Sequence, residues 1–272
     1  KHVLDCLEYG VDMVWIGART TASPFLVQEI ADALKGKDIP VLVKNPVNPD
    51  IDLWIGALER LNQAGIRKLG VVHRGFSSTE KILYRNSPGW QLAVELRTRY
   101  PELPFFADPS HMGGDRKYLH EISQRALDLG LDGLMVETHC DPSCAMSDAR
   151  QQITPEEFGR LISGLIVRQN DTDSPDYKEN MYQLRAQIDV IDENLLSLLN
   201  ARMNLSRSIG LYKKAHNISI IQTSRWESIL SQMIEKAKAY GLPEEFVTEI
   251  FNAIHEESVQ QQNRILSDRD AD

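Results

Sequence analysis

The sequence has few of the residues that mark secreted, membrane-spanning or nucleic-acid-binding proteins. Its three cysteines, Cys6, Cys140 and Cys144, are too few and odd in number for a disulfide framework, which favours the reducing cytoplasm. No apolar run approaches the ~20 residues of a membrane span, and no signal peptide is visible. The net charge of −9 comes without a block of Lys and Arg, which argues against nucleic acid as a partner.

What is present fits a globular protein of one or two domains, since 42% of the 272 residues are hydrophobic and 25% are charged. Residues 1–166 alternate short apolar runs with helical patterns. The runs are apolar on both faces, as strands of a parallel sheet covered by helices must be, and this alternation predicts an α/β fold. We predict the strands at 11–18, 39–45, 68–75, 103–110 and 132–139.

Every predicted strand ends in charged or polar residues. A doubly wound sheet would gather its ligand residues at one switch point, whereas polar ends on all strands are typical of a (β/α) barrel, whose site lies at the C-terminal face. The sequence contains neither GxGxxG nor GxxxxGK followed by Ser or Thr, which argues against nucleotide-binding folds.

The character of the sequence changes after Ile166. Residues 167–176 are polar and contain Pro175, which predicts a linker. Residues 177–272 show only helical periodicity, beginning with one long amphipathic helix. Gly241 and Pro243 separate the second helix of this region from a third, so we predict an all-α three-helix domain.

Three residues of the first region are candidate metal ligands: His111, Glu137 at a strand end, and Asp148 in the following loop. Oxygen and imidazole donors suit Mn²⁺ or Fe²⁺ better than zinc in a thiolate cage. Such groups also serve as general bases or buried structural groups, and His111 alone would more often be an ordinary loop histidine.

Arg19, Lys44 and Arg74 end three neighbouring strands. Three cations that face one mouth repel each other and therefore favour an anion, for which phosphate is the natural choice. A single solvated strand-end cation is common, but three together are harder to explain in that way. Lys44 has a second possible role as a Schiff-base lysine, although a metal would already supply the electrophile.

The motifs GARTT, KNP, HRGF, DPSHMGGD and VETH followed by SDARQQ occur in this order within residues 1–166. Together they resemble the barrel of the short class of 3-deoxy-D-arabino-heptulosonate 7-phosphate (DAHP) synthases, a (β/α)8 TIM barrel. The resemblance implies that phosphoenolpyruvate condenses with erythrose 4-phosphate at a divalent metal such as Mn²⁺, and that phosphate is released. The residues it implies are the metal ligands His111, Glu137 and Asp148, and the phosphoenolpyruvate-binding Arg19, Lys44 and Arg74, with Lys44 also catalytic.

The first region departs from this family in length. The family barrel has eight strands and ~250 residues, whereas only five strands are predicted here. The family's cysteine metal ligand and basic aldose-phosphate segment have no counterpart, because Cys6 lies in a helical pattern. An open five-strand piece would expose sheet edges, so we expect that the sequence lacks the first three strand–helix units.

Cations and polar side chains also recur at helical spacing in the second region. Lys213 follows Arg202 by about 1,100° of helix, close to three full turns, so the two share a face. Ser258 and Gln262 share a face at i,i+4. Arg185 lies about 100° out of register with Arg202 and could serve another chain's pocket, although an isolated helical arginine is usually a solvated surface charge.

The segments LRAQIDVIDENLLSLLNAR, GLYKK, SRWESIL and ESVQQQ lie within residues 177–266 and resemble the all-helical chorismate mutases. The resemblance implies a homodimer whose sites each borrow one arginine, here Arg185. It implies that chorismate rearranges to prephenate without a base or nucleophile, because cations hold the compact conformer and stabilise the breaking ether oxygen. The own-chain groups it implies are Arg202, Lys213, Arg225, Ser258 and Gln262, with Lys213 and Gln262 at that oxygen.

Two positions depart from the mutase pattern. Gln222 and Trp226 stand where the family has acidic residues, one of which contacts the substrate hydroxyl, so Gln222 is an alternative contact and Trp226 is an alternative core residue. We predict a bifunctional enzyme of aromatic amino acid biosynthesis, with prephenate or chorismate as a feedback signal. The alternatives are a related sugar-acid phosphate synthase that uses another aldose, and a helical tail that only dimerises and binds effectors.

Overall fold

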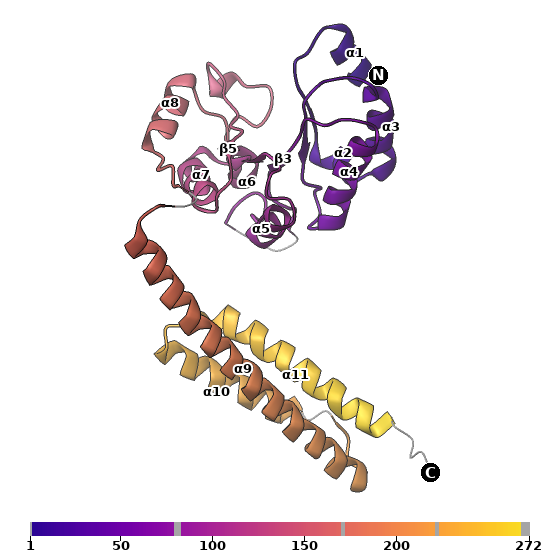
Figure 1. The fold of residues 1–272 in the computed structure, drawn as a ribbon, viewed down its shortest axis with the longest axis vertical. Helices are drawn as coiled ribbons and strands as arrows, with labels where there is room; N and C mark the ends of the chain where they lie inside the picture. The colour runs from indigo at the N-terminus through magenta and orange to yellow at the C-terminus, as the bar shows by residue number, and fades with distance from the viewer. Residues whose placement is uncertain (1, 79–82, 170–171, 221–222, 268–272) are drawn as a thin grey trace. The chain divides into compact units, whose positions relative to one another are not determined.

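The computed structural model describes residues 2–78, 83–169, 172–220 and 223–267. It divides the chain into two compact units, residues 1–171 and 172–272, which Figure 1 shows as a sheet with helices and a helical region. The predicted linker, 167–176, spans this division, although helix α9 already begins at Pro175. Within the described ranges, no helix is long and apolar enough to cross a membrane.

The first unit contains one parallel sheet of five strands in the order β1-β2-β3-β4-β5, which confirms the predicted α/β class. Val43 of β2 pairs with Val71 of β3, and Val71 pairs with Phe105 of β4. A sequential parallel order is that of consecutive units of a (β/α) barrel. The strands span Val14–Ile16, Val41–Lys44, Leu69–His73, Phe105–Ala107 and Gly133–Leu134. All five are shorter than predicted.

Helices connect the strands of the first unit, as the alternation of apolar runs with helical patterns predicts. Asp50 caps the longest of them, α4, by accepting a hydrogen bond from the Leu53 amide at 3.0 Å, as Asp does at helix N-termini. The helices and 3₁₀ turns are α1 His2–Glu8, α2 Ala18–Thr21, α3 Pro24–Leu34, α4 Ile51–Gln63, α5 Trp90–Arg99, α6 Pro109–Gly113, η1 Arg116–Tyr118, α7 Leu119–Asp128, η2 Pro142–Cys144 and α8 Pro155–Gly164.

An aromatic cluster lies in the core between the sheet and α4. Trp54 of α4 is fully buried, and its indole N–H donates to the carbonyl of Val43 at 3.1 Å. Its ring meets Phe105 edge-to-face at 5.7 Å and stacks on His73 at 6.0 Å. This packing fixes β2, β3 and β4, whose ends carry the polar residues of the cavity described below.

His73 places a titratable ring in this core. Its Nε2 lies 2.5 Å from the carbonyl of Pro88, which can only accept, so Nε2 carries the proton. Nδ1 is buried without a hydrogen-bond partner among the described residues, and protonating it would add an unsatisfied donor. Burial lowers the pKa of His73 to about 4, against the opposing hydrogen bond to Pro88.

We expect this histidine to make the first unit less stable in mild acid. The unfolded chain takes up a proton near pH 6.5, whereas the folded chain does not until about pH 4, so stability is full above pH 6.5 and falls below it. The loss over this interval is about 3 kcal/mol. The free energy of unfolding, measured with urea at pH 7 and at pH 4, should therefore change by about 3 kcal/mol less in His73→Phe than in the wild-type protein. An equal dependence in both proteins would contradict the assignment.

The second unit consists of α9 Pro175–Ala215, α10 Thr223–Ala239 and α11 Glu244–Ser267, which confirms the predicted all-α region. Helix α9 has 41 residues and is therefore about 60 Å long. Its backbone approaches α11 closely at Gly210, where an added Cβ would lie 3.2 Å from the Cα of Gln262. Ser174 caps α9 by accepting from the Tyr177 amide.

Candidate active sites

The first unit has a cavity of about 640 Å³ at the C-terminal ends of its strands. Its lining residues lie at the ends of the strands or in the segments that follow them, which is where a (β/α) barrel places its site. All six predicted residues of this unit line it: Arg19, Lys44, Arg74, His111, Glu137 and Asp148.

The three candidate metal ligands converge in this cavity. One donor atom from each of His111, Glu137 and Asp148 lies within 4.8 Å of the others. Nδ1 of His111 lies 2.8 Å from Asp108, and Nε2 faces Glu137 at 3.7 Å. A carboxylate next to the second ring nitrogen of a ligating histidine is a usual partner in metal sites, but within the described residues Nδ1 has this proximity without a hydrogen bond of suitable geometry. One imidazole and two carboxylates fit a hard or borderline divalent ion such as Mn²⁺ or Fe²⁺.

Asp108 connects these ligands to the cations. It is 1% exposed, its Oδ1 accepts from the His111 amide at 3.0 Å, and its Oδ2 accepts from Lys44 Nζ at 2.7 Å. Burial alone would raise the pKa of Asp108, but the hydrogen bond and charge of His111 and those of Lys44 outweigh it and keep the pKa low. The segment DPSHMGGD therefore caps α6 with its aspartate and aims its histidine into the cavity.

Arg74 is held by two asparagines. The side-chain oxygen of Asn45 accepts from the Arg74 amide at 2.7 Å, and that of Asn86 accepts from the guanidinium at 3.0 Å. Burial lowers the pKa of Arg74 most; Asp108 opposes this, while Arg85 and Arg19 lower it further. The mutual repulsion of these arginines favours an anionic ligand between them.

Two lining or supporting residues were not predicted from the sequence. Arg85 donates to Asp148 Oδ1 at 2.7 Å and to Gln151 Oε1 at 2.8 Å, and Gln151 donates to Glu137 Oε2 at 2.7 Å. Gln151 lies within the SDARQQ motif, but no strand-end pattern distinguishes it from its neighbours. Its partners are 14 and 66 residues away in the chain.

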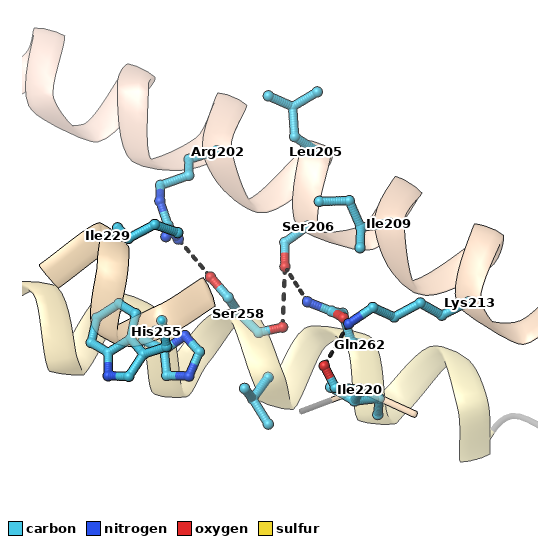
Figure 2. Close-up of a pocket in the computed structure, with 12 residues that line it drawn as sticks. Arg202, Leu205, Ser206, Ile209, Lys213, Ile220, Ile229, His255, Ser258 and Gln262 are labelled. Atoms are coloured by element: carbon cyan, nitrogen blue, oxygen red, sulfur yellow. Dashed lines mark hydrogen bonds between the residues drawn. The ribbon is translucent and has the colours of Figure 1, made fainter. Parts of the chain in front are cut away.

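The second unit has its own cavity, of about 260 Å³, between its three helices. Figure 2 shows Arg202, Ser206 and Lys213 of α9 pointing toward Ser258 and Gln262 of α11. Arg202 donates to Ser258 Oγ at 2.5 Å, and Gln262 donates to Ser206 Oγ at 3.2 Å. The structure thus brings together four of the six predicted mutase-like residues named above: Arg202, Lys213, Ser258 and Gln262.

The remaining predicted residues of the second unit lie elsewhere. Arg185 is exposed near the start of α9 and does not line this cavity. Gln222 and the side chain of Arg225 lie outside the described residues. Trp226 does line the cavity, where it stacks on His255 with ring centroids 4.0 Å apart. Burial, with the nearby Arg202, lowers the pKa of His255, so this wall is neutral.

Both units match enzyme families, and each match covers the unit that holds the corresponding cavity. The model of the DAHP synthetase I family matches residues 4–171, and the model of chorismate mutase type II matches residues 184–263. The chain therefore belongs to the DAHP synthetase I family, with a chorismate mutase type II domain following in the same polypeptide.

Individual relatives agree with these matches. The chain is 32% identical to phospho-2-dehydro-3-deoxyheptonate aldolase of Thermotoga maritima over 57% of its own length and 44% of the relative's. It is 35% identical to the bifunctional chorismate mutase/prephenate dehydratase of Buchnera aphidicola over 30% of its length and 21% of the relative's. The solved truncated form of the Thermotoga maritima DAHP synthase superposes with a TM-score of 0.53 at 29% identity, covering 59% of each chain. The chain thus spans less than half the length of these curated relatives.

Proposed function

We propose that the first unit carries the site of a metal-dependent condensation of phosphoenolpyruvate with erythrose 4-phosphate. The observation that supports this most is the single cavity in which three ligand candidates lie beside Arg19, Lys44 and Arg74. A bound divalent metal, with Mn²⁺ as the candidate, would supply Lewis-acid polarisation of the aldehyde. Arg74 and Arg19 would bind the charged groups of phosphoenolpyruvate, and Lys44, oriented by Asp108, would add a third donor.

The test is phosphate release from phosphoenolpyruvate and erythrose 4-phosphate, with Mn²⁺ and with a chelator. Arabinose 5-phosphate in place of erythrose 4-phosphate tests the alternative of a different aldose. Release that needs Mn²⁺ and erythrose 4-phosphate supports the proposal. Release that survives chelation would contradict the metal site.

We propose that the second unit converts chorismate to prephenate. Its cavity presents two cations and an amide, with Arg202 and Lys213 on one helix and Gln262 opposite. Chorismate is a dicarboxylate whose rearrangement needs orientation and charge stabilisation rather than a base, and these groups supply both. Loss of chorismate absorbance on mixing with the protein tests this, and no turnover would favour a helical unit that only binds effectors.

We further propose that a second copy of the chain covers the first half of α9. Leu184, Ile188, Ile191, Leu195 and Leu198 are 53–68% exposed. Their spacing of four and three residues is that of a coiled-coil seam. Such a stripe is too apolar to face water along its length. Arg185 follows its first residue, so pairing along the stripe would present this arginine to the partner.

Ile191→Asp should therefore weaken the dimer at least 100-fold, because a carboxylate would be buried in the seam without a partner. Sedimentation velocity across a concentration series measures the shift toward monomer. Ser197→Asp is the matched control, since it adds the same charge on α9 about 120° away from the stripe. Equal effects of the two substitutions, or no effect of Ile191→Asp, would contradict pairing along this stripe.

The presence of both units in one chain supports a regulatory link, in which prephenate or chorismate bound to the helices changes the rate of the barrel. Synthase rates of the intact protein with and without prephenate test this. Unchanged rates would remove the proposal without affecting either catalytic assignment.

A further inference from the structure

Gln151 is a buried polar residue that lies beside the candidate metal ligands and is not itself one of them. Its side chain belongs to the loop between Glu137 and α8, and the residue is only 1% exposed. Burying an amide is costly unless both of its ends are hydrogen-bonded. Both are: Nε2 donates to Glu137 Oε2 at 2.7 Å, and Oε1 accepts from Arg85 at 2.8 Å.

These two hydrogen bonds link two of the three ligand candidates. Glu137 is bonded directly, which leaves its other oxygen facing His111 Nε2 at 3.7 Å. Asp148 is reached through Arg85, whose guanidinium donates to Asp148 Oδ1 at 2.7 Å. Asp148 also has a φ of +52°, a left-handed conformation that is unfavourable for residues other than glycine and that surrounding contacts must maintain.

The chemistry of the two partners explains why an amide occupies this position. Glu137 is a carboxylate and needs a donor, whereas Arg85 needs an acceptor. A glutamine offers one of each at a fixed separation, whereas an ionised Glu offers only acceptors and Met offers no donor and only a weak acceptor. The amide also adds no charge beside the ligands, so it orients Glu137 without competing for a cation.

We propose that Gln151 is a positioning residue for the metal site: it fixes the carboxylate of Glu137 and, through Arg85, that of Asp148. This inference rests on the proposed metal site of the first unit. Partners of this kind typically change metal affinity by about 10–100-fold when they are removed. The expectation for Gln151→Met, which keeps the length but loses both hydrogen bonds, is a loss of Mn²⁺ affinity in this range.

The experiment is a titration of the full chain with Mn²⁺, in which free ion is measured by electron paramagnetic resonance. Gln152→Met is the matched control, because Gln152 is the next residue and, within the part of the chain that the structure describes, its amide donates to the Ser147 carbonyl rather than to a ligand candidate. The Mn²⁺ affinity of this variant should stay within about twofold of wild type. The spectrum of bound Mn²⁺ should broaden in Gln151→Met, which a loss of stability alone would not cause. Should Gln151→Met not fold, Gln151→Asn, one methylene shorter, is expected to show a smaller loss.

The outcomes separate this inference from the metal proposal. Wild-type protein that binds no Mn²⁺ would overturn both. Wild-type protein that binds Mn²⁺ with the same affinity and spectrum as the folded Gln151 variant would overturn the positioning role alone. An equal loss in Gln152→Met would also overturn it, because the effect would then belong to the loop in general.

Discussion

Replacing Lys44 with Met is expected to destabilise the first unit by about 3–5 kcal/mol. Lys44 Nζ and Asp108 Oδ2 are 2.7 Å apart, and their side chains are only 11% and 1% exposed. Removal of the ammonium leaves the Asp108 carboxylate buried without its ion-pair partner, and an uncompensated buried charge costs far more than the pair contributes. The same change removes a cation from the cavity, so phosphoenolpyruvate binding should also be lost.

Urea unfolding followed by tryptophan fluorescence measures the free energy of unfolding of the first unit, because Trp54 lies in its core. Lys68→Met is the matched control, since Lys68 forms an equally short ion pair with Asp38 in which both side chains are more than half exposed; its cost should stay within about 1 kcal/mol. The double variant Lys44→Met, Asp108→Asn should recover most of the stability but not ligand binding. Equal costs at Lys44 and Lys68 would contradict the buried pair.

The fold of the first unit follows from local patterns, because strands buried on both faces must be apolar throughout. Each of the five predicted strands is present, in chain order. The predicted strands extend beyond the observed ones: the apolar run before Asp108 predicts that this residue belongs to a strand, whereas it caps helix α6. Whether such a residue ends a strand or caps a helix depends on its hydrogen bonds, and hydrophobic periodicity carries no information on these.

The residues of the candidate sites also fall into those that local sequence patterns predict and those that they do not. Strand-end position was enough to select Lys44 and Arg74, and helical phase was enough to place Arg202 and Lys213 on one wall. Gln151 could not be selected, because its role depends on two partners, Glu137 and Arg85, that come from other segments of the chain. The helical phase of Arg185 differs from that of Arg202, so the sequence does not assign Arg185 to a pocket of its own chain. In the structure it lines neither of the two cavities described above. The catalytic roles themselves remain predictions.

Arg202→Gln should lower kcat/KM for chorismate by about 100–1,000-fold, the usual cost of removing one donor that stabilises developing or bound negative charge. The guanidinium lines the cavity and donates to Ser258 Oγ and to the Ile254 carbonyl, so it is held in one orientation before a ligand arrives. Glutamine keeps a donor but loses the charge and the fork that match a carboxylate. If the charge of Arg202 binds substrate and transition state equally, its loss would raise KM. If it stabilises the transition state selectively, its loss would lower kcat.

Arg207→Gln on the same helix separates this effect from a general change of charge. Arg207 is exposed, and its hydrogen bonds go to Gln261 and Asn204 rather than into the cavity. It lies five residues from Arg202, about 140° around the helix. Chorismate kinetics of the two variants should therefore differ by at least 100-fold although both lose one positive charge. Similar kinetics would mean that the cavity of the second unit does not hold the reacting dicarboxylate, and the reading of this unit as an effector-binding module would replace the catalytic one.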